Sequence, residues 1–482
     1  MSAQPASHAH SIENAMYTKA RLSRDPRFDG TFFVAVKTTG IFCRPICPAK
    51  LPKEENVSYY QHATAAMADG YRPCLRCRPD SAPQSAAWLG VNATVNRAIS
   101  LLSAIPVESI SVIAARLGIS ERYLNKLLVE ELGMSPKQFQ SMNRALFAKQ
   151  LIQQSHLSMT DIAFTVGYQS LRQLQRAVEQ YCNTTPSKLR KQNVVVQKDV
   201  QLFLSYRPPY NWEYVRQFLL TRAIDGMEKV TDDTYSRWFE WEGESGHFSA
   251  KHDAERRGFA VTLRLTNLRV LHRVIENIKA MLDLHADPAL ISDSLQKAGL
   301  LQKQLTQGLR LPSAWSVFES GCRAIVGQQV SVKAAIGQVT LLVHHLGNPV
   351  SASLNEQSNS EIGKGKENAQ FNFPLPDVVA NSDLAFLRMP AARKAAIKQF
   401  AQLFCQHSTP SHDEILAIKG IGPWTLDYLQ MRGERNPDIY LGGDLIVRKT
   451  AERLPIFPEQ AAPWRSYLTL QLWQLSDLIE QS

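Results

Sequence analysis

The hydrophobic and polar positions divide the chain into four stretches with different patterns. Up to about residue 83 the apolar positions form short runs, TFFVAV and NVSYY, which are typical of strands. Residues 88–191 place apolar side chains at helical spacing, with glycine or proline at the turns. Residues 201–284 include alternating segments such as FAVTLRL, which predict strands among helices, and the rest of the chain has a helical pattern again. We therefore expect a multidomain α+β protein.

A polar segment interrupts the last helical stretch. Residues 347–373, GNPVSASLNEQSNSEIGKGKENAQFNF, are rich in serine, asparagine, glycine and charged side chains. Such a composition cannot bury enough apolar surface to form its own core, so we expect a loop. The whole chain has 482 residues, which is too long for one compact core and corresponds to about three domains of ordinary size.

Composition and charge narrow the classes of protein. Hydrophobic residues make up 44% and charged residues 20%, which excludes a disordered chain. The formal net charge is +10, from 54 Lys+Arg against 44 Asp+Glu, which favours nucleic acid or an acidic membrane surface as a partner. No apolar run approaches the ~18 residues that span a bilayer, and the N-terminus does not resemble a signal peptide. We therefore expect a cytoplasmic protein that is not associated with a membrane.

Four of the seven cysteines form two close pairs near the N-terminus. Cys43 and Cys47 lie in GIFCRPICP, and Cys74 and Cys77 lie in YRPCLRCRP. This spacing favours a tetrahedral site in which four thiolates bind one zinc ion. The alternatives are a purely structural zinc site and two disulfides, which are rare in the cytosol. The remaining cysteines are far apart and are expected to be small core residues: Cys182, Cys322 and Cys405.

The residues around these cysteines resemble the N-terminal domain of Ada-type adaptive-response proteins. The similarity covers RFDGTFFVAVKTTGIFCRPICP, ENVSYY and GYRPCLRCRPD. In that family a zinc-bound thiolate takes a methyl group from a DNA methylphosphotriester. The resemblance implies that Cys43 is the acceptor and that the other three cysteines complete the zinc site. It also implies phosphate contacts by four residues, which are Thr39, Lys50, Arg72 and Arg76.

The charge of such a site suggests a switch. Zinc with four thiolates has a formal charge of about −2 and repels DNA phosphate. Methylation of one sulfur removes one negative charge, so the affinity for DNA should rise.

Two consecutive segments predict a pair of helix-turn-helix units. SVIAARLGISERYLNKLLVEELGMSPKQF has its turn at Gly118 and an N-cap at Ser120, and MTDIAFTVGYQSLRQLQRAVEQYCNTTPSKLRK has its turn at Gly167. The second copy resembles AraC-type regulators, and an amphipathic bundle with solvated charges is the alternative. The exposed positions of the second helices, suited to base edges or phosphates, are Arg122, Asn125, Lys126, Ser170, Arg172, Gln173 and Arg176.

A helix-hairpin-helix is predicted in ILAIKGIGPWTLDYLQMRG. Gly420 and Gly422 let the backbone turn tightly and present N–H groups to a DNA phosphate. About twenty residues later, Asp444 follows two glycines in IYLGGDLIVRK. An aspartate at a helix start is often only an N-cap, so the surrounding sequence must decide its role.

The surrounding sequence resembles AlkA-type alkyladenine DNA glycosylases from about residue 206 to residue 473, except in the polar loop. The similarity rests on YRPPYNWEYVRQFLLTRAIDGMEKV, LRLPSAWSVFESGCRAIVGQQVSV, the hairpin and APWRSYLTLQLW. It implies that Asp444 supports loss of the damaged base and that Gln329 is the wedge, where leucine is familiar. The implied aromatic pocket consists of Trp424, Tyr428 and Trp473. In helix-hairpin-helix glycosylases that also nick the backbone, a lysine nucleophile follows this hairpin, so Trp424 at that place implies no lyase step.

Together these features predict a DNA alkylation-repair protein that also regulates transcription. The expected parts are an Ada-type zinc domain at 1–85, an AraC-type double helix-turn-helix at 88–192, a mixed α/β subdomain at 200–285 and a helix-hairpin-helix glycosylase domain at 286–482. The expected enzyme is a monofunctional 3-methyladenine glycosylase with a single-turnover methylphosphotriester acceptor. Its expected cofactor is one Zn²⁺ without an organic cofactor, and its expected partners are alkylated double-stranded DNA, promoter DNA and RNA polymerase. The alternatives are a regulator whose glycosylase-like half only binds DNA and a zinc-dependent transcription factor without acceptor chemistry.

Overall fold

The computed structural model describes residues 16–24, 32–61, 63–74, 76–77, 79, 91–190, 199–350 and 369–480. The chain divides into two compact units, Met1–Gln140 and Ser141–Ser482, with the boundary inside helix α7 (Pro136–Gln154). In the described ranges, no helix is both long and apolar enough to cross a membrane.

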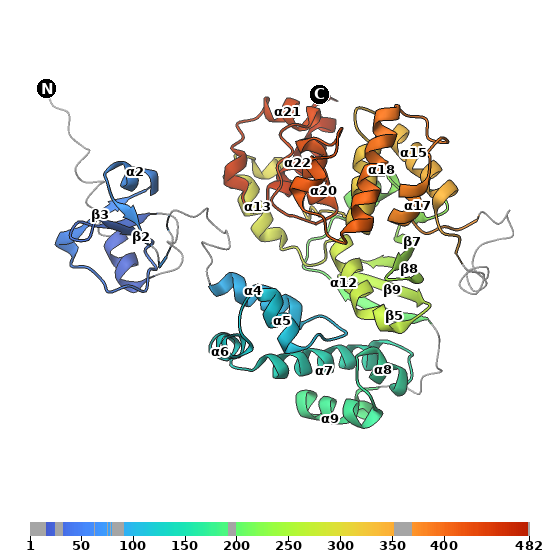
Figure 1. Ribbon diagram of the computed structural model, residues 1–482, viewed down its shortest axis with the longest axis horizontal. Helices are drawn as coiled ribbons and strands as arrows, with labels where there is room; N and C mark the ends of the chain where they lie inside the picture. Colours follow the sequence, from blue (N-terminus) through green and yellow to red (C-terminus); the bar gives the residue numbers. More distant parts are fainter. Residues whose placement is uncertain are drawn as a thin grey trace. The chain divides into compact units, whose positions relative to one another are not determined.

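The first unit begins with a four-stranded sheet in the order β3-β1-β2-β4, coloured blue in Figure 1. Strand β1 pairs antiparallel with both β2 and β3, while β2 and β4 are parallel. The run TFFVAV alternates its side chains between two faces, with Phe33 and Ala35 packed in one cluster and Phe32 and Val34 in another. The elements are β1 (Phe33–Val36), β2 (Ile41–Cys43), β3 (Val57–Tyr60), α2 (Ala63–Ala68) and β4 (Arg72–Pro73).

The first unit continues with three helices that contain the first helix-turn-helix. They are α4 (Val91–Leu102), α5 (Ile110–Leu117) and α6 (Glu121–Leu132). Gly118 ends α5 in the left-handed conformation, with φ 69°, and the Ser120 side chain caps α6 by accepting from the backbone N–H of Tyr123. Both features follow from the sequence signals, because a left-handed C-cap favours glycine and an N-cap favours serine.

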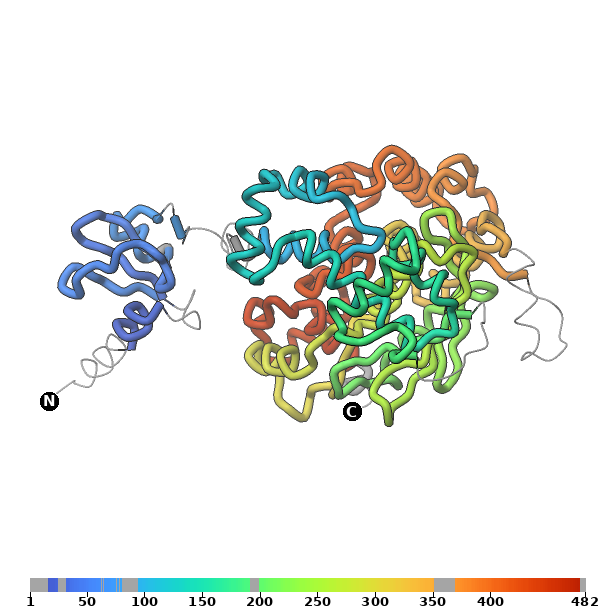
Figure 2. Tube along the Cα trace, turned by 90° about the horizontal axis from the view of Figure 1, so that it is seen from below, coloured from blue at the N-terminus to red at the C-terminus, as the bar shows by residue number. Residues whose placement is uncertain are grey.

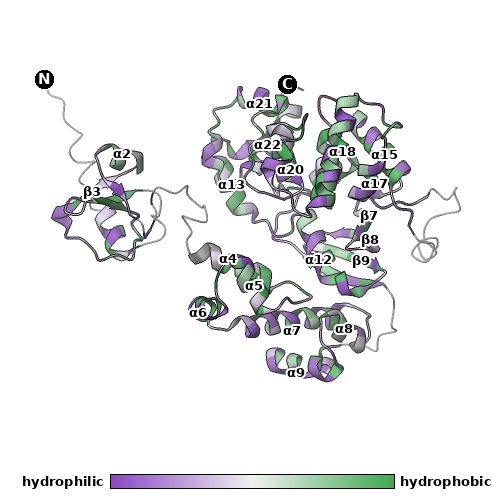
Figure 3. Ribbon diagram, viewed as in Figure 1, coloured by the Kyte–Doolittle hydropathy of each residue, from purple (hydrophilic) through white to green (hydrophobic). Residues whose placement is uncertain are grey.

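The second unit begins with the second helix-turn-helix, formed by α8 (Met159–Thr165) and α9 (Leu171–Cys182), followed by α10 (Pro186–Leu189). Ser170 caps α9, and Gly167 lies in the turn with φ 81°. Helix α9 has one buried face, with Leu174 and Val178, and Figure 3 shows both hydrophobic and hydrophilic residues along it.

A five-stranded antiparallel sheet follows, in the order β5-β9-β8-β7-β6. The segment FAVTLRL lies in β9, which confirms the alternating pattern as a strand. The strands are β5 (Val200–Ser205), β6 (Glu228–Val230), β7 (Thr234–Trp241), β8 (Glu244–Asp253) and β9 (Gly258–Leu265). The accompanying helices are α11 (Trp212–Leu220), α12 (Leu271–Met281) and α13 (Pro288–Lys297).

The last part of the second unit is a group of helices, orange to red in Figures 1 and 2. They are α14 (Val317–Val326), α15 (Val332–Leu346), α17 (Pro376–Asn381), α18 (Ala391–Gln406), α19 (His412–Leu416), α20 (Pro423–Arg432), α21 (Leu445–Ala451) and α22 (Arg465–Glu480). Phe318, Phe400 and Leu429 belong to their common core. Most of the expected loop, residues 351–368, lies outside the described residues, and Pro349 and Phe371 bridge its two ends.

The three separate cysteines differ in burial. Cys322 is buried as expected, and Cys182 is half-buried. The prediction that Cys405 is a core residue is wrong, because its side chain is exposed in the last turn of α18.

Candidate functional site

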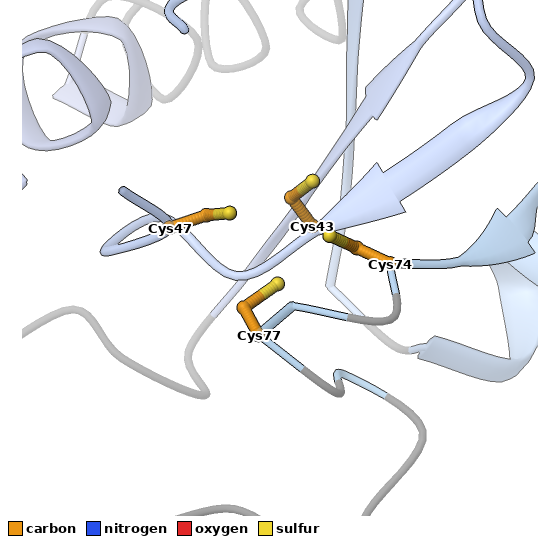
Figure 4. Close-up of side chains that lie close together, drawn as sticks. All are labelled: Cys43, Cys47, Cys74 and Cys77. Atoms are coloured by element: carbon orange, nitrogen blue, oxygen red, sulfur yellow. The ribbon is translucent and has the colours of Figure 1, made fainter. Parts of the chain in front are cut away.

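Two neighbouring strands bring the four N-terminal cysteines together. The parallel pairing of β2 with β4 places Cys43, at the end of β2, near Cys74, whose N–H donates to the Phe42 carbonyl at 2.9 Å. The four sulfur atoms all lie within 4.8 Å of one another. Figure 4 shows them pointing toward a common space, with Cys47 and Cys77 completing the set.

This cluster has the geometry and the electrostatics of a zinc ligand set. A tetrahedral ion with Zn–S bonds of about 2.3 Å requires sulfur atoms ~3.8 Å apart, which this cluster can provide. Hydrogen bonding to Cys47 and Cys77, together with burial, raises the pKa of Cys43 far above that of an ordinary thiol. Four such crowded thiols cannot all ionise unless a cation lies among them. The four cysteines therefore form the site of one zinc ion.

The four residues expected to contact phosphate all have exposed side chains. Thr39 lies in the turn between β1 and β2, and Lys50 lies in the loop after Cys47. Arg72 is on β4, and Arg76 lies between Cys74 and Cys77. Their contact with DNA stays a prediction.

The expected DNA-reading side chains are exposed on the second helix of each helix-turn-helix. On α6 these are Arg122, Asn125 and Lys126, beside the buried Leu124 and Leu127. On α9, Arg172 and Arg176 are exposed one helical turn apart, and Gln173 and Ser170 begin the same helix. Each helix thus has a polar face available to DNA.

A cavity of about 820 Å³ in the second unit brings together Trp424, Tyr428, Trp473 and Asp444. Trp424 and Tyr428 lie one turn apart on α20 and stack, with ring centroids 5.5 Å apart and an interplanar angle of 24°. The cavity is also lined by side chains of α11, α14, α15, α21 and α22. Residues far apart in the sequence thus form one aromatic pocket with a carboxylate.

Asp444 is the N-cap of α21 and is half-buried. Its Oδ1 accepts hydrogen bonds from the N–H groups of Ile446 and Val447, at 3.0 and 3.1 Å. The same oxygen accepts from the indole Nε1 of Trp473 at 3.1 Å. Asp444 is therefore an N-cap, as its place at a helix start suggested, and its carboxylate also lines the aromatic cavity.

The hairpin joins α19 to α20, and its two glycines have different backbone roles. Gly420 has φ +97°, a conformation that other residues rarely adopt. Gly422 is the N-cap of α20 with φ −108°, so its conformation does not require glycine. The side-chain amide of Gln328 donates to the Gly420 carbonyl at 2.8 Å and to the Thr425 hydroxyl at 2.9 Å.

Gln329, the expected wedge, is exposed in the turn between α14 and α15. Its φ is +56°, and it is not among the residues that line the cavity. Its role as a wedge stays a prediction.

Sequence reasoning missed several polar residues that line the cavity, among them Arg222, Ser320 and Arg432. Arg432 continues the row of Trp424 and Tyr428 at a spacing of four residues on α20, so helical periodicity could have found it. Ser320 and Arg222 have no such signal, because long-range packing alone brings them to the cavity.

These parts define a DNA-binding repair protein that combines a zinc-thiolate module, a pair of helix-turn-helix units and a DNA glycosylase domain. The chain belongs to the family of bifunctional transcriptional activator/DNA repair enzymes. It is 32% identical to the probable bifunctional transcriptional activator/DNA repair enzyme AlkA of Mycobacterium tuberculosis, and the match covers 94% of this chain and 95% of that protein.

Other similarities correspond to the separate parts. DNA-3-methyladenine glycosylase 2 of Escherichia coli is 28% identical over 56% of this chain and 95% of its own length. The bifunctional transcriptional activator/DNA repair enzyme Ada of Escherichia coli is 33% identical over 35% of this chain and 47% of its own length. Family models match the metal binding domain of Ada at residues 16–80, a helix-turn-helix domain at 113–192 and the AlkA N-terminal domain at 201–316.

Proposed function

We propose that this protein repairs alkylated DNA in two ways and uses one of them to activate transcription. It excises bases of the 3-methyladenine type by hydrolysis of the N-glycosidic bond, and it accepts one methyl group from a DNA methylphosphotriester on Cys43. The observation that carries the glycosylase proposal is the presence of Asp444 in the cavity of Trp424, Tyr428 and Trp473. The four domain ranges at 1–85, 88–192, 200–285 and 286–482 are part of this proposal.

In the proposed excision, the damaged nucleotide leaves the duplex and its base enters the cavity. The base stacks against the aromatic side chains, while the Asp444 carboxylate stabilises the positive charge that develops on the sugar. The glycosidic bond breaks with its electron pair going to the cationic base, which leaves neutral, and water adds to C1′ and releases one proton to the solvent. Gln329 fills the space left in the duplex, and the backbone around Gly420 and Gly422 holds a nearby phosphate.

The reaction stops at an abasic site. A lyase requires an amine nucleophile that forms a Schiff base with the sugar. Trp424 follows the hairpin where such a lysine would lie, and no lysine is among the described residues that line the cavity. We therefore propose a monofunctional glycosylase.

In the proposed methyl transfer, the Cys43 thiolate attacks the methyl carbon, the C–O bond breaks, and the phosphotriester becomes an ordinary phosphodiester. Bound zinc keeps the thiols deprotonated at neutral pH. Cys43 and Cys74 are half-buried, whereas Cys47 and Cys77 are buried, so Cys43 is among the two more accessible sulfurs. The N–H of Arg44 donates to the Cys77 sulfur at 3.3 Å, which makes Cys77 a weaker nucleophile.

The methylated protein then reads promoter DNA through Arg122 on α6 and through Arg172 and Arg176 on α9. Thr39, Lys50, Arg72 and Arg76 hold phosphates beside the zinc site. We propose that activation requires contact with RNA polymerase. We also propose that the protein acts on the bacterial nucleoid in the cytoplasm.

One experiment tests both activities. The purified protein is incubated with methylated duplex DNA, the released bases are identified by chromatography, and the protein is analysed by mass spectrometry. We expect free 3-methyladenine and a single added methyl group on the peptide that contains Cys43. DNA binding without base release would favour the alternative, a regulator whose glycosylase-like half only binds DNA.

A further inference from the structure

The DNA reader (α7, α8 and α9) contacts the five-stranded sheet of the glycosylase half through one face of α7. Phe147 and Gln154 lie seven residues apart on α7, which is two helical turns, so they share this face. Phe147 is only 7% exposed, although it belongs to the part of the chain that reads DNA. Both residues lie in Ser141–Ser482, the compact unit that also contains the sheet, so their partners are found within that unit.

The ring of Phe147 packs against a histidine of α12. The rings of Phe147 and His272 are T-shaped, with centroids 4.7 Å apart and an interplanar angle of 81°. Burial lowers the pKa of His272, so at neutral pH the imidazole is largely uncharged and packs as an aromatic ring. Edge-to-face pairs of this kind contribute stability beyond the burial of their surface. This pair therefore links the DNA reader to the first turn of α12.

A hydrogen bond at the edge of the sheet forms a second link. Strand β5 is an edge strand, and the backbone N–H of its Phe203 donates to the side-chain oxygen of Gln154 at 3.1 Å. Helix α8 takes part as well, because it packs against the short helix η3 (Leu268–Val270), which directly precedes α12. Edge strands have unpaired backbone groups that readily bind another segment. At this edge, the segment that binds comes from the DNA reader.

These contacts give the sheet a role that base excision does not require. None of the four residues Phe147, Gln154, Phe203 and His272 lines the cavity of Asp444. Building on the proposed reading of promoter DNA, we infer that β5 and the start of α12 form a docking surface for the DNA reader of the same chain. Docking holds α8 and α9 in place before DNA binds, so the two DNA-binding halves are energetically coupled.

The coupling follows from the cost of ordering a binding element. A recognition helix that is already held in place loses less conformational freedom when it enters the major groove of DNA. A docked reader should therefore bind its sequence more tightly than an undocked one. Substitutions of the docking surface in the glycosylase half should then weaken the reading of DNA, although they change no side chain that is proposed to contact a base.

The test measures sequence preference in the full-length, zinc-loaded protein. The wild type selects a duplex from a random pool, and the preference is the affinity for this duplex divided by that for an unselected duplex of equal length. His272→Ala removes the ring contact and leaves Arg172 and Arg176 unchanged. We expect it to lower the preference roughly two- to tenfold, the range that one edge-to-face pair supports. Gln154→Ala removes only the hydrogen bond, so its preference should fall by a smaller factor.

The matched control is His247→Ala. His247 is also a half-buried histidine whose pKa burial lowers, but its ring lies against Trp238 of the same sheet, with a centroid distance of 4.5 Å. Its preference should equal that of the wild type. Phe147→Ala completes a double-mutant cycle with His272→Ala. Because both variants lose the same contact, the double variant should lose no more than the larger single effect, whereas independent effects would add.

The outcomes separate docking from the proposed function. An unchanged preference in folded His272→Ala and Gln154→Ala would overturn the docking surface and leave the proposed reading of DNA intact, and additive losses in the cycle would also overturn it. Circular dichroism identifies a variant that does not fold, and if Phe147→Ala is such a variant, the other two decide the result.

A wild type that selects no sequence from the pool would overturn the proposed reading of DNA itself. Docking is then decided by the same cycle in urea unfolding. The changes in the free energy of unfolding should again be less than additive, and additive changes would overturn the contact.

Discussion

Trp473 donates a hydrogen bond from its indole Nε1 to the Oδ1 atom of Asp444, 3.1 Å away and 29 residues earlier in the chain. The same oxygen accepts two backbone N–H groups of α21. In the part of the chain that the structure describes, Oδ2 accepts no hydrogen bond. One oxygen therefore fixes the rotamer of the carboxylate, and the other is available for chemistry in the cavity.

Because the two oxygens have different roles, Asp444→Asn should remove the negative charge and keep the capping hydrogen bonds. Its amide oxygen can accept the three N–H groups in place of Oδ1, and asparagine is as good an N-cap as aspartate. The negative charge is lost, so we expect base release to fall by about 10²-fold or more. The free energy of unfolding should change by less than about 1 kcal/mol. Released 3-methyladenine, measured under single-turnover conditions, and urea unfolding provide the two readouts.

Asp287→Asn is the matched control for this substitution. Asp287 caps α13 through the N–H groups of Ala289 and Leu290, in the same manner as Asp444 caps α21, but it does not line the cavity. Its base release should equal that of the wild type. Base release by Asp444→Asn at the wild-type rate would refute the catalytic assignment.

The product of excision should be an intact strand that contains an abasic site, because Trp424 stands where a lyase has its lysine. A denaturing gel should show full-length DNA before treatment with alkali and cleaved DNA afterwards. Borohydride should trap no covalent complex. Cleavage without alkali, or a trapped complex, would show that an amine of this chain attacks the sugar.

Methylation of Cys43 should strengthen promoter binding through charge. The zinc site loses one negative charge, while the two helix-turn-helix motifs supply the contacts with the bases. We expect the ratio of affinities of methylated to unmethylated protein to shrink as salt is added, because screening weakens interactions between exposed charges beyond about 8–10 Å. Promoter titrations at two salt concentrations measure this ratio.

Cys43→Ser supplies the control, because it cannot accept the methyl group and should show no gain after exposure to methylated DNA. Cys43→Ser and Cys74→Ser each remove one zinc ligand, so zinc content and folding of the domain are measured for both variants. Equal affinities at low salt for methylated and unmethylated protein would exclude an electrostatic switch, even with methyl transfer established.

Asp283 predicts a pH dependence of stability in the second unit. Burial raises the pKa of Asp283 to about 6, although its carboxylate accepts from the Leu311 N–H and the Tyr467 hydroxyl, each at 2.8 Å. As the pH rises, the unfolded chain, in which the pKa of this carboxyl is near 3.9, therefore loses the proton at a lower pH than the folded state does. The stabilising contribution is complete below about pH 4 and is lost as the pH rises through 6, by up to about 3 kcal/mol.

The measurement is urea unfolding at pH 4.5 and pH 7.5, for the wild type and for Asp283→Asn. Tryptophan fluorescence is suitable, since all of the eight tryptophans except Trp88 lie in Ser141–Ser482. The free energy of unfolding of Asp283→Asn, relative to that of the wild type, should be larger at pH 7.5 than at pH 4.5. A difference between the two proteins that does not vary with pH would contradict the raised pKa.

Local signals predicted the local parts of the structure. Ser120 and Gly118 occupy their cap positions because helix ends depend on a few neighbouring residues. The paired spacing of the cysteines indicated the zinc site, since two short loops suffice to bring Cys43 and Cys74 together. The alternation in FAVTLRL identified β9 because one face of each strand is buried.

Features that depend on long-range packing could not be predicted from local signals in the sequence. Arg432 looks like an ordinary charged helix residue, and only long-range packing buries it at the cavity. The left-handed conformation of Gln329 depends on the turn between two helices, and the residue type gives no sign of it. The exposure of Cys405 depends on where α18 ends relative to the core.

The bonds from Gln328 to Gly420 and Thr425 have a consequence for how damage is found. Gln329 is adjacent to Gln328, so the proposed wedge is tied to the hairpin that is proposed to hold the phosphate. If the wedge and the hairpin both contact one duplex, we expect the duplex to bend at the place where it is held. Weakly stacked or mispaired steps bend at low cost, whereas intact DNA resists. We therefore expect the protein to bind more readily at damaged steps that bend easily than at intact DNA.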